Sequence, residues 1–284
     1  SRGLGDVYKR QHMPLTKMCF TAEQINKLGL DTIIVGSDEV WNYNDSKSVS
    51  PVKFGEGLTC KNLISYAPSA GNSSIENLPD FAKKGIKRYN SISVRDYTTE
   101  NLVFQVTGKH PQIVLDPTLL ANWEVNVDSP VKKKDYILFY YCEHLPVHIK
   151  TQIFDYAHKN GLAVYGAGDS DKDYDECTVN LTPEEWVAMF KNARFVFTGT
   201  FHGVIFSILN HRQFKVYLTN KGRIAKVGNL LSYFSIKDRE IDNHYIFDLE
   251  KQRSEIDYAS IDRIIDKQRL ESLNYLRDSI QSTK

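Results

Sequence analysis

One short segment combines the groups that anion binding and proton transfer need. It reads Thr198-Gly-Thr-Phe-His-Gly203 and lies between an apolar β-type run, Phe195 to Phe197, and an apolar helical stretch, Val204 to Asn210. Backbone N–H groups at such a strand-to-helix turn attract anions, and the His202 imidazole can act as a general acid or base near neutral pH. The alternative is a structural histidine whose ring nitrogens are satisfied within the fold.

Arg95 and Asp116 also follow apolar runs directly. Arg95 comes after Ser91 to Val94, and its planar guanidinium suits a carboxylate or phosphate ligand. The alternative for Arg95 is an ion pair with Asp96 or with another loop carboxylate. Asp116 comes after Gln112 to Leu115, where it can contact a substrate or brace the turn that follows.

Ser37 and Asp38 follow a third run, Thr32 to Val35. Their side chains can bind a sugar hydroxyl or form an Asx-type turn. The sequence contains no Walker loop, no His-Glu-x-x-His, no Gly-x-Ser-x-Gly and no paired metal-ligand spacing, so we expect no metal site.

Composition excludes several classes of protein. The 284 residues include 36 Lys and Arg against 35 Asp and Glu, a formal charge of +1, so the chain lacks the basic surplus of a nucleic-acid binder. Its length suits about two domains. The four cysteines form no Cys-x-x-Cys pair and are expected to be reduced core residues. No apolar stretch reaches the roughly 20 residues that span a bilayer.

The polar segments must be positioned by parallel α/β units. From Asp31 onward, β-branched or aromatic runs alternate with helical segments, as in such units, and ligands collect at the carboxyl ends of their strands. The predicted strands are Thr32 to Val35, Asn62 to Tyr66, Ser91 to Val94 and Gln112 to Leu115, then Tyr136 to Tyr141, Leu162 to Tyr165, Phe195 to Phe197 and Phe214 to Tyr217. Helices are predicted at 145–160, at 182–192 behind a Thr182/Glu185 capping box, from Thr98 or Thr99 to Gly108, and at 256–280 as one helix or two.

The chain divides at residues 121–135, which lose apolar periodicity and carry three consecutive lysines. We therefore predict an incomplete N-terminal Rossmann-like half at 12–121, a C-terminal Rossmann-like half at 135–250 and a helical segment at 251–284. Residues 1–11, SRGLGDVYKRQ, are basic and patternless, and we expect them to be a non-native scar.

Five ordered motifs resemble the polysaccharide pyruvyl transferase family. They are DTIIVGSDEVWN at 31–42, SYAPSAG at 65–71, SISVRD at 91–96, VLDPTL at 114–119 and TGTFHG at 198–203, and residues 223–231 are also similar. The resemblance covers about residues 31–241. It implies two Rossmann-type halves in a GT-B-like arrangement with the active site in the cleft between them. It also implies transfer of a pyruvyl group from phosphoenolpyruvate to a sugar, as a ketal across two hydroxyls of a bacterial cell-wall or exopolysaccharide precursor.

The implied chemistry suits the residues. Ketal formation needs a proton on the enol carbon, attack by a sugar hydroxyl, loss of phosphate and closure by a second hydroxyl. Catalytic roles fall to Arg95, which would bind the anionic donor, and to His202, which would act as acid–base catalyst or stabilise phosphate. The expected substrate-binding residues are Thr200 and Gly203 at the anion turn, Arg223 as a second cation, and Ser37, Asp38 and Asp116. The resemblance implies no metal and no cofactor, with phosphoenolpyruvate as a substrate.

One departure concerns the start of the chain. Members of the family normally begin with a further strand and a Gly/Asn-rich turn that leads into a helix, and nothing before Asp31 resembles it. We therefore expect an N-terminal half that lacks its first βα unit.

Two other functions fit the same layout. One is a GT-B glycosyltransferase that uses a nucleotide sugar, since fold alone does not decide function, and the other is an inactive, truncated fragment that binds a glycan. For the pyruvyl transferase, the expected partners are phosphoenolpyruvate and a glycan or lipid-linked sugar, without nucleic acid. The expected location is the cytoplasm, including the inner face of the membrane when the acceptor brings the protein there.

Overall fold

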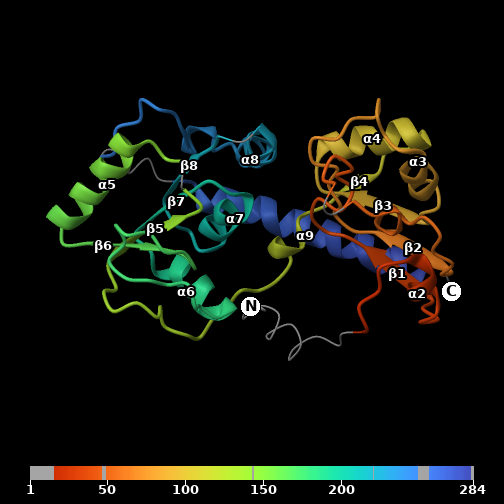
Figure 1. The fold of residues 1–284 in the computed structure, drawn as a ribbon, viewed down its shortest axis with the longest axis horizontal. Coiled ribbons are helices and arrows are strands. Elements are labelled where there is room, and N and C mark those ends of the chain that lie inside the picture. The colour runs from red at the N-terminus through yellow and green to blue at the C-terminus, as the bar shows by residue number, and fades with distance from the viewer. Residues whose placement is uncertain (1–15, 47–48, 143, 220, 249–255, 283–284) are drawn as a thin grey trace. The chain divides into compact units, whose positions relative to one another are not determined.

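A computed structural model describes residues 16–46, 49–142, 144–219, 221–248 and 256–282. Two compact units form within it (Figure 1). The N-terminal unit comprises Thr16–Ala121 and Asp262–Lys284, and the C-terminal unit comprises Asn122–Ile261. Each unit is built around a parallel sheet, which confirms the α/β class and the two Rossmann-like halves. The segment 1–11, predicted to be non-native, lies outside the described residues.

The sheet of the N-terminal unit has four parallel strands in sequential order: β1 (Thr32–Val35), β2 (Asn62–Ser65), β3 (Ser91–Val94) and β4 (Gln112–Ile113). Its helices are α2 (Ala22–Asn26), α3 (Asp80–Ile86), α4 (Tyr97–Thr107) and the 3-10 turns η1 (Pro51–Phe54) and η2 (Pro117–Leu119). All four strands begin where the sequence predicts them. Two of them, β2 and β4, end earlier than predicted.

The two faces of this sheet are covered by different parts of the chain. One face packs against α3 and α4 in a core that includes Trp41 and Leu63. The other face packs against α9 (Tyr258–Gln281), whose Tyr275 donates a hydrogen bond to the Ser65 carbonyl at 2.9 Å. The sequence indicated a helical segment at 251–284 without a place in either half. The structure makes it one helix that, from Asp262 on, belongs to the N-terminal unit.

The C-terminal unit contains a five-stranded parallel sheet in the order β6 (Ala163–Gly166), β5 (Tyr136–Tyr140), β7 (Phe195–Thr198), β8 (Phe214–Tyr217) and β9 (Glu240–Ile241). The strand after β5 is added on one side of it, and all later strands are added on the other. The strand order therefore reverses between β5 and β7, and ligands of open α/β sheets bind at such a reversal. The short strand β9 was not predicted.

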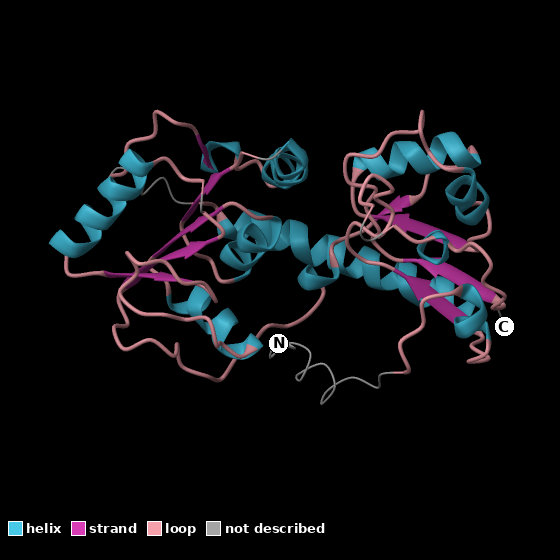
Figure 2. Ribbon diagram, in the orientation of Figure 1, coloured by secondary structure: helices cyan, strands magenta, loops and turns pink. Residues whose placement is uncertain are grey.

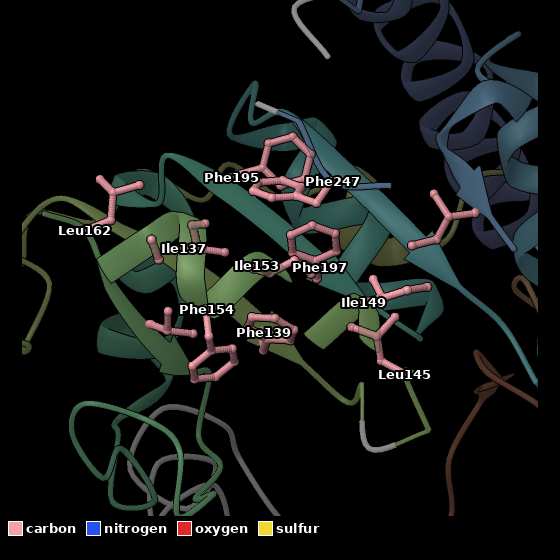
Figure 3. Packing of buried hydrophobic residues seen from close by; sticks show 13 residues of the cluster. Ile137, Phe139, Leu145, Ile149, Ile153, Phe154, Leu162, Phe195, Phe197 and Phe247 are labelled. Carbon is pink, nitrogen blue, oxygen red and sulfur yellow. The ribbon is translucent and has the colours of Figure 1, made fainter. Parts of the chain in front are cut away.

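Helices cover both faces of this second sheet (Figure 2). Ile137 and Phe139 of β5 pack on α5 (Val147–Lys159) through Ile149 and Ile153, which lie one helical turn apart (Figure 3). On the opposite face, Tyr136 donates a hydrogen bond to a carbonyl of α6 (Pro183–Asn192). Two more helices, α7 (Phe201–Leu209) and α8 (Lys221–Tyr233), follow β7 and β8, and the turn η3 (Lys237–Arg239) precedes β9.

Helix starts follow the local capping chemistry. The capping box at Thr182 and Glu185 is present at the start of α6. The predicted cap of α4 at Thr98 or Thr99 is wrong, because Asp96 is the cap and accepts hydrogen bonds from both the N–H and the hydroxyl of Thr99 at 2.8 Å. A carboxylate on extended backbone at a strand end can accept both donors at once. The predicted stop at Gly108 is present.

Candidate functional site

The strand-to-helix turn after β7 is held by its own threonines. Thr200 is the N-cap of α7, and its Oγ1 accepts a hydrogen bond from the Gly203 N–H at 3.0 Å. The Thr200 N–H in turn donates to Thr198 Oγ1 at 3.2 Å. These contacts show Thr200 and Gly203 shaping the turn itself, while their contact with a substrate stays a prediction.

Close packing explains both glycines of this turn. A Cβ on Gly203 would lie 2.0 Å from Thr198 Oγ1, and a Cβ on Gly199 would lie 2.5 Å from the Tyr141 carbonyl oxygen. Any side chain at either position would collide with the neighbouring strand ends. The first turn of α7 is thereby held against the carboxyl end of β7, and the residue directly after β7 is held against Tyr141, which follows β5.

His202 lies in the first turn of α7 and is half-buried. Its ring meets the Phe201 ring edge-on, with centroids 5.6 Å apart. The N-terminal end of a helix carries a partial positive charge, so this position favours an anion beside the imidazole. The structure thus places the predicted acid–base residue at the end of the helix that attracts negative charge.

Two cations of α8 flank the same turn. Arg223 Nη1 lies 3.5 Å from the Gly199 carbonyl oxygen, and its guanidinium carbon lies 6.0 Å from the Tyr141 ring centroid. Lys226 Nζ lies 4.8 Å from the ring centroid of Phe201. Arg223 and Lys226 are three residues apart and therefore share one side of α8. We call Thr198–Gly203 together with Tyr141, Arg223 and Lys226 the β7–α7 site.

The sequence reasoning missed Lys226 and Tyr141. The signal for Lys226 was its i, i+3 spacing from Arg223 within a segment that the family resemblance had already singled out. Tyr141 follows β5 directly, in the row of residues after strands, but it reads as the end of an apolar run. Its φ of 52° is unusual for a residue other than glycine, and such strained backbone concentrates at functional sites.

The β7–α7 site also lies where the strand order reverses. Tyr141 directly follows β5, and Thr198 is the last residue of β7. Tyr140 pairs with Thr198, and Gly199 packs closely against the Tyr141 carbonyl, so the ends of these two strands meet directly. Position and charge together make this the best candidate for a small anionic ligand in the C-terminal unit.

In the N-terminal unit, Arg95 takes the ion pair that the sequence left open. Its Nη1 lies 2.6 Å from Asp116 Oδ2, and its Nη2 lies 3.3 Å from Asp38 Oδ1. The partner proposed first, Asp96, caps α4 instead. Arg95 and Asp116 are almost fully buried, whereas 64% of the Asp38 side chain is exposed. The structure therefore joins three predicted site residues at the carboxyl ends of β1, β3 and β4.

Asp116 braces its turn as well as pairing with Arg95. Its carboxylate accepts hydrogen bonds from the Thr118 N–H at 3.0 Å and the Thr118 hydroxyl at 2.6 Å. Burial acts to raise the pKa of Asp116, but the charge of Arg95 and the hydrogen bonds of Thr118 outweigh it and hold that pKa below its ordinary value. Asp116 is thus ionised and enclosed, and direct contact with a substrate stays a prediction for it.

Ser37 and Asp38 lie in the loop after β1. Asp38 has a φ of 68°, and its carbonyl oxygen accepts a hydrogen bond from the Ser69 N–H at 2.8 Å, which ties this loop to the one after β2. The Asp38 carboxylate accepts a hydrogen bond from Arg95 Nη2 at 3.3 Å. Ser37 is half-buried beside it, and sugar binding by this pair is untested.

The described residues contain neither a metal-binding cluster nor a membrane-spanning helix. No three His, Cys, Asp or Glu side chains among them are grouped so as to hold a metal ion. No helix in the described part of the chain is both long and apolar enough to cross a membrane.

These features define an α/β protein with two parallel-sheet units whose strand ends carry charged and polar side chains. The chain belongs to the polysaccharide pyruvyl transferase family, whose family model matches residues 4–217, well over half of its length. The match begins inside the segment 1–11. Among curated proteins, none matches the chain.

Among the solved structures similar to the chain are two transferases. One is the glycotransferase of kitacinnamycin, at 11% identity and a TM-score of 0.42, covering 88% of this chain and 72% of that one. The other is a mutant O-GlcNAc transferase of Thermobaculum terrenum, at 9% identity and a TM-score of 0.38, covering 92% of this chain and 51% of that one.

Proposed function

We propose that this protein transfers a pyruvyl group from phosphoenolpyruvate to a sugar of a cell-surface polysaccharide or its precursor, forming a ketal across two hydroxyls. Family membership supports a transferase of this class. The proposal that phosphoenolpyruvate is the donor rests on the β7–α7 site, where His202 lies at a helix N-terminus flanked by Arg223 and Lys226.

The charge of the donor suits that site. Phosphoenolpyruvate bears a carboxylate and a phosphate, and binding it requires cations and N–H donors in one place. Arg223, Lys226 and the positive end of α7 supply them within a single unit. A neutral chain can therefore hold a strongly anionic substrate, because the cations are local.

The reaction then needs one group that exchanges a proton near neutral pH. A proton adds to the enol methylene carbon, and a sugar hydroxyl oxygen attacks the neighbouring carbon and loses its proton. The C–O bond to phosphate then breaks, and a second hydroxyl oxygen closes the ketal while its proton passes to the departing phosphate. His202 is the proposed proton donor or acceptor, and it also stabilises the departing phosphate.

Arg95 is proposed as a second anion-binding group, in the N-terminal unit. An incoming anion would compete with the exposed Asp38 carboxylate rather than with the buried Asp116. The partners proposed are a glycan or lipid-linked acceptor and no cofactor. The proposed location is the cytoplasm and, with a lipid-linked acceptor, the inner membrane face.

Acceptor-dependent release of inorganic phosphate tests the proposal. The purified protein is incubated with phosphoenolpyruvate, with and without a panel of oligosaccharide and lipid-linked acceptors, and phosphate is measured. We expect release only when an acceptor is present. A rise in melting temperature with nucleotide sugars but not with phosphoenolpyruvate would favour a glycosyltransferase and contradict the proposal.

A further inference from the structure

A cavity of about 350 Å³ lies at the carboxyl ends of β5 and β6 in the C-terminal unit. Its lining includes Tyr141, Lys150, Asp169, Asp171 and Tyr174. The volume is at the lower end of the range for small-molecule sites. None of these residues except Tyr141 contributes to the β7–α7 site, so the cavity is a separate feature of the same sheet edge.

The charge in this cavity is unsuited to an anion. Lys150 Nζ binds Asp171 Oδ2 at 2.9 Å and Asp173 Oδ2 at 2.8 Å, so two negative carboxylates already outnumber its single positive charge. Asp169 adds a further carboxylate to the lining. A phosphate or carboxylate ligand would face net negative charge here, whereas it meets cations at the β7–α7 site.

The lining suits a neutral ring that carries hydroxyls. An ionised carboxylate only accepts hydrogen bonds, so Asp169 and Asp171 can accept hydrogen bonds from the hydroxyl groups of a sugar. The hydrogen bond from Lys150 lowers the pKa of Asp171 and keeps it ionised. Tyr141 and Tyr174 supply aromatic surface for the C–H face of such a ring.

Tyr141 connects the cavity to the β7–α7 site. It lines the cavity, and its ring lies under the Arg223 guanidinium. A ligand in the cavity would therefore lie next to a donor held by Arg223 and His202. The two sites carry opposite charge, which suits an anionic donor and a neutral acceptor. They share the Tyr141 side chain, so two ligands bound there would be adjacent, as a transfer reaction requires.

We propose that this cavity binds the neutral sugar acceptor, beside the donor in the C-terminal unit. That the sugar is an acceptor rests on the proposed function, whereas its chemical class rests on the cavity itself. The specificity expected from the carboxylates is for uncharged hexopyranosides over sugar phosphates and uronates, because the latter bring like charge to Asp169 and Asp171.

Saturation-transfer NMR with the methyl glycosides of glucose, galactose and mannose tests the cavity without any reaction. We expect at least one to bind the wild-type protein, and methyl glucuronide to bind more weakly. Asp169→Asn is expected to weaken that binding about tenfold, the scale of a hydrogen bond to a charged group. Ser170→Trp places a large ring at the cavity wall and is expected to abolish it.

The exposed Asp155 on the neighbouring helix α5 provides a matched control, and Asp155→Asn is expected to bind as the wild type does. Melting temperatures establish that each variant is folded. The inference is overturned if no methyl glycoside binds, if both cavity variants bind normally, or if glucuronide binds best. Sugar binding that depends on the cavity, without acceptor-dependent phosphate release, would contradict the proposed function and leave the ligand class of the cavity standing.

Discussion

Arg95 Nη1 and Asp116 Oδ2 are 2.6 Å apart, and only 5% and 2% of their side chains are exposed. Arg95 directly follows β3, and Asp116 follows β4, so this ion pair joins the ends of neighbouring strands. Removing one member of a buried pair leaves the other charge without compensation in a poorly solvated place. The pair therefore matters for stability whether or not Arg95 binds a substrate.

Replacing Arg95 with Met should destabilise the protein by about 3–5 kcal/mol near neutral pH, measured by urea unfolding. In the wild type the folded-state pKa of Asp116 is lowered, so its stabilising contribution is present above its unfolded-state pKa of 3.8 and is lost as pH falls through the folded-state value. In Arg95→Met, burial without the cation raises the pKa of Asp116, so the difference between the proteins should shrink as the solution becomes acidic.

The exposed ion pair of Lys61 and Asp31 is the control for that measurement. Its side chains are 80% and 76% exposed, and Lys61→Met should leave the unfolding free energy unchanged within error. An Arg95→Met protein as stable as the wild type at neutral pH would show that the buried pair contributes little.

His202→Ala should lower kcat/KM for pyruvyl transfer by about a hundredfold or more, the usual loss for a positioned acid–base group. His202→Gln keeps a hydrogen-bonding side chain but cannot titrate, so it should remove the pH dependence that His202 imposes. The exposed His244 serves as control, and His244→Ala should be fully active. A loss of less than about threefold in His202→Ala would assign this histidine a structural role.

Arg223→Met and Lys226→Met should each raise KM for phosphoenolpyruvate about tenfold or more, because each removes a charge-assisted contact with the donor. The effect of the two together should exceed either alone, and KM for the acceptor should change little. Lys237→Met, at an exposed position beyond α8, is the matched control. Steady-state phosphate release at varied donor concentration separates these cases, and unchanged donor KM in both variants would remove α8 from the donor site.

Gly203→Ala should destabilise the C-terminal unit by about 1–3 kcal/mol, because its Cβ would overlap Thr198 Oγ1. Gly228→Ala is the opposite case. That residue lies within α8 with no atom near its would-be Cβ, so alanine should stabilise the helix by roughly 0.5–1 kcal/mol. Thermal unfolding of the two variants tests the contrast, and a stabilised Gly203→Ala protein would mean that the β7–α7 turn is more open than described.

Much of the local structure could be predicted because it depends on neighbouring residues. The strands Thr32–Val35, Ser91–Val94 and Phe214–Tyr217 have the predicted bounds, since apolar β-branched and aromatic runs leave few other conformations favourable. The α6 capping box depends on two side chains three residues apart. The position of His202 after a strand and before a helix follows from the same local pattern.

Contacts between distant segments could not be predicted in this way. Asp96 follows Arg95 directly, yet Arg95 pairs with Asp116, because the parallel register of β3 and β4 brings their carboxyl ends together. Lys226 joins the β7–α7 site only because α8 packs on α7. The order of the strands, and with it the reversal between β5 and β7, is likewise a property of the sheet.

The segment Thr198–Gly203 illustrates both kinds of relationship, local and long-range. Its residue types and spacing already indicated an anion-binding turn, because helix capping and glycine conformation act over a few residues. The sequence alone could not show that position 203 must be glycine because a Cβ would overlap Thr198. It also could not show that two cations of α8 flank the turn, or that Tyr141 links the turn to a carboxylate-lined cavity. Those relationships arise from packing between strands and helices far apart in sequence, where geometry and burial, rather than local propensity, decide which groups meet.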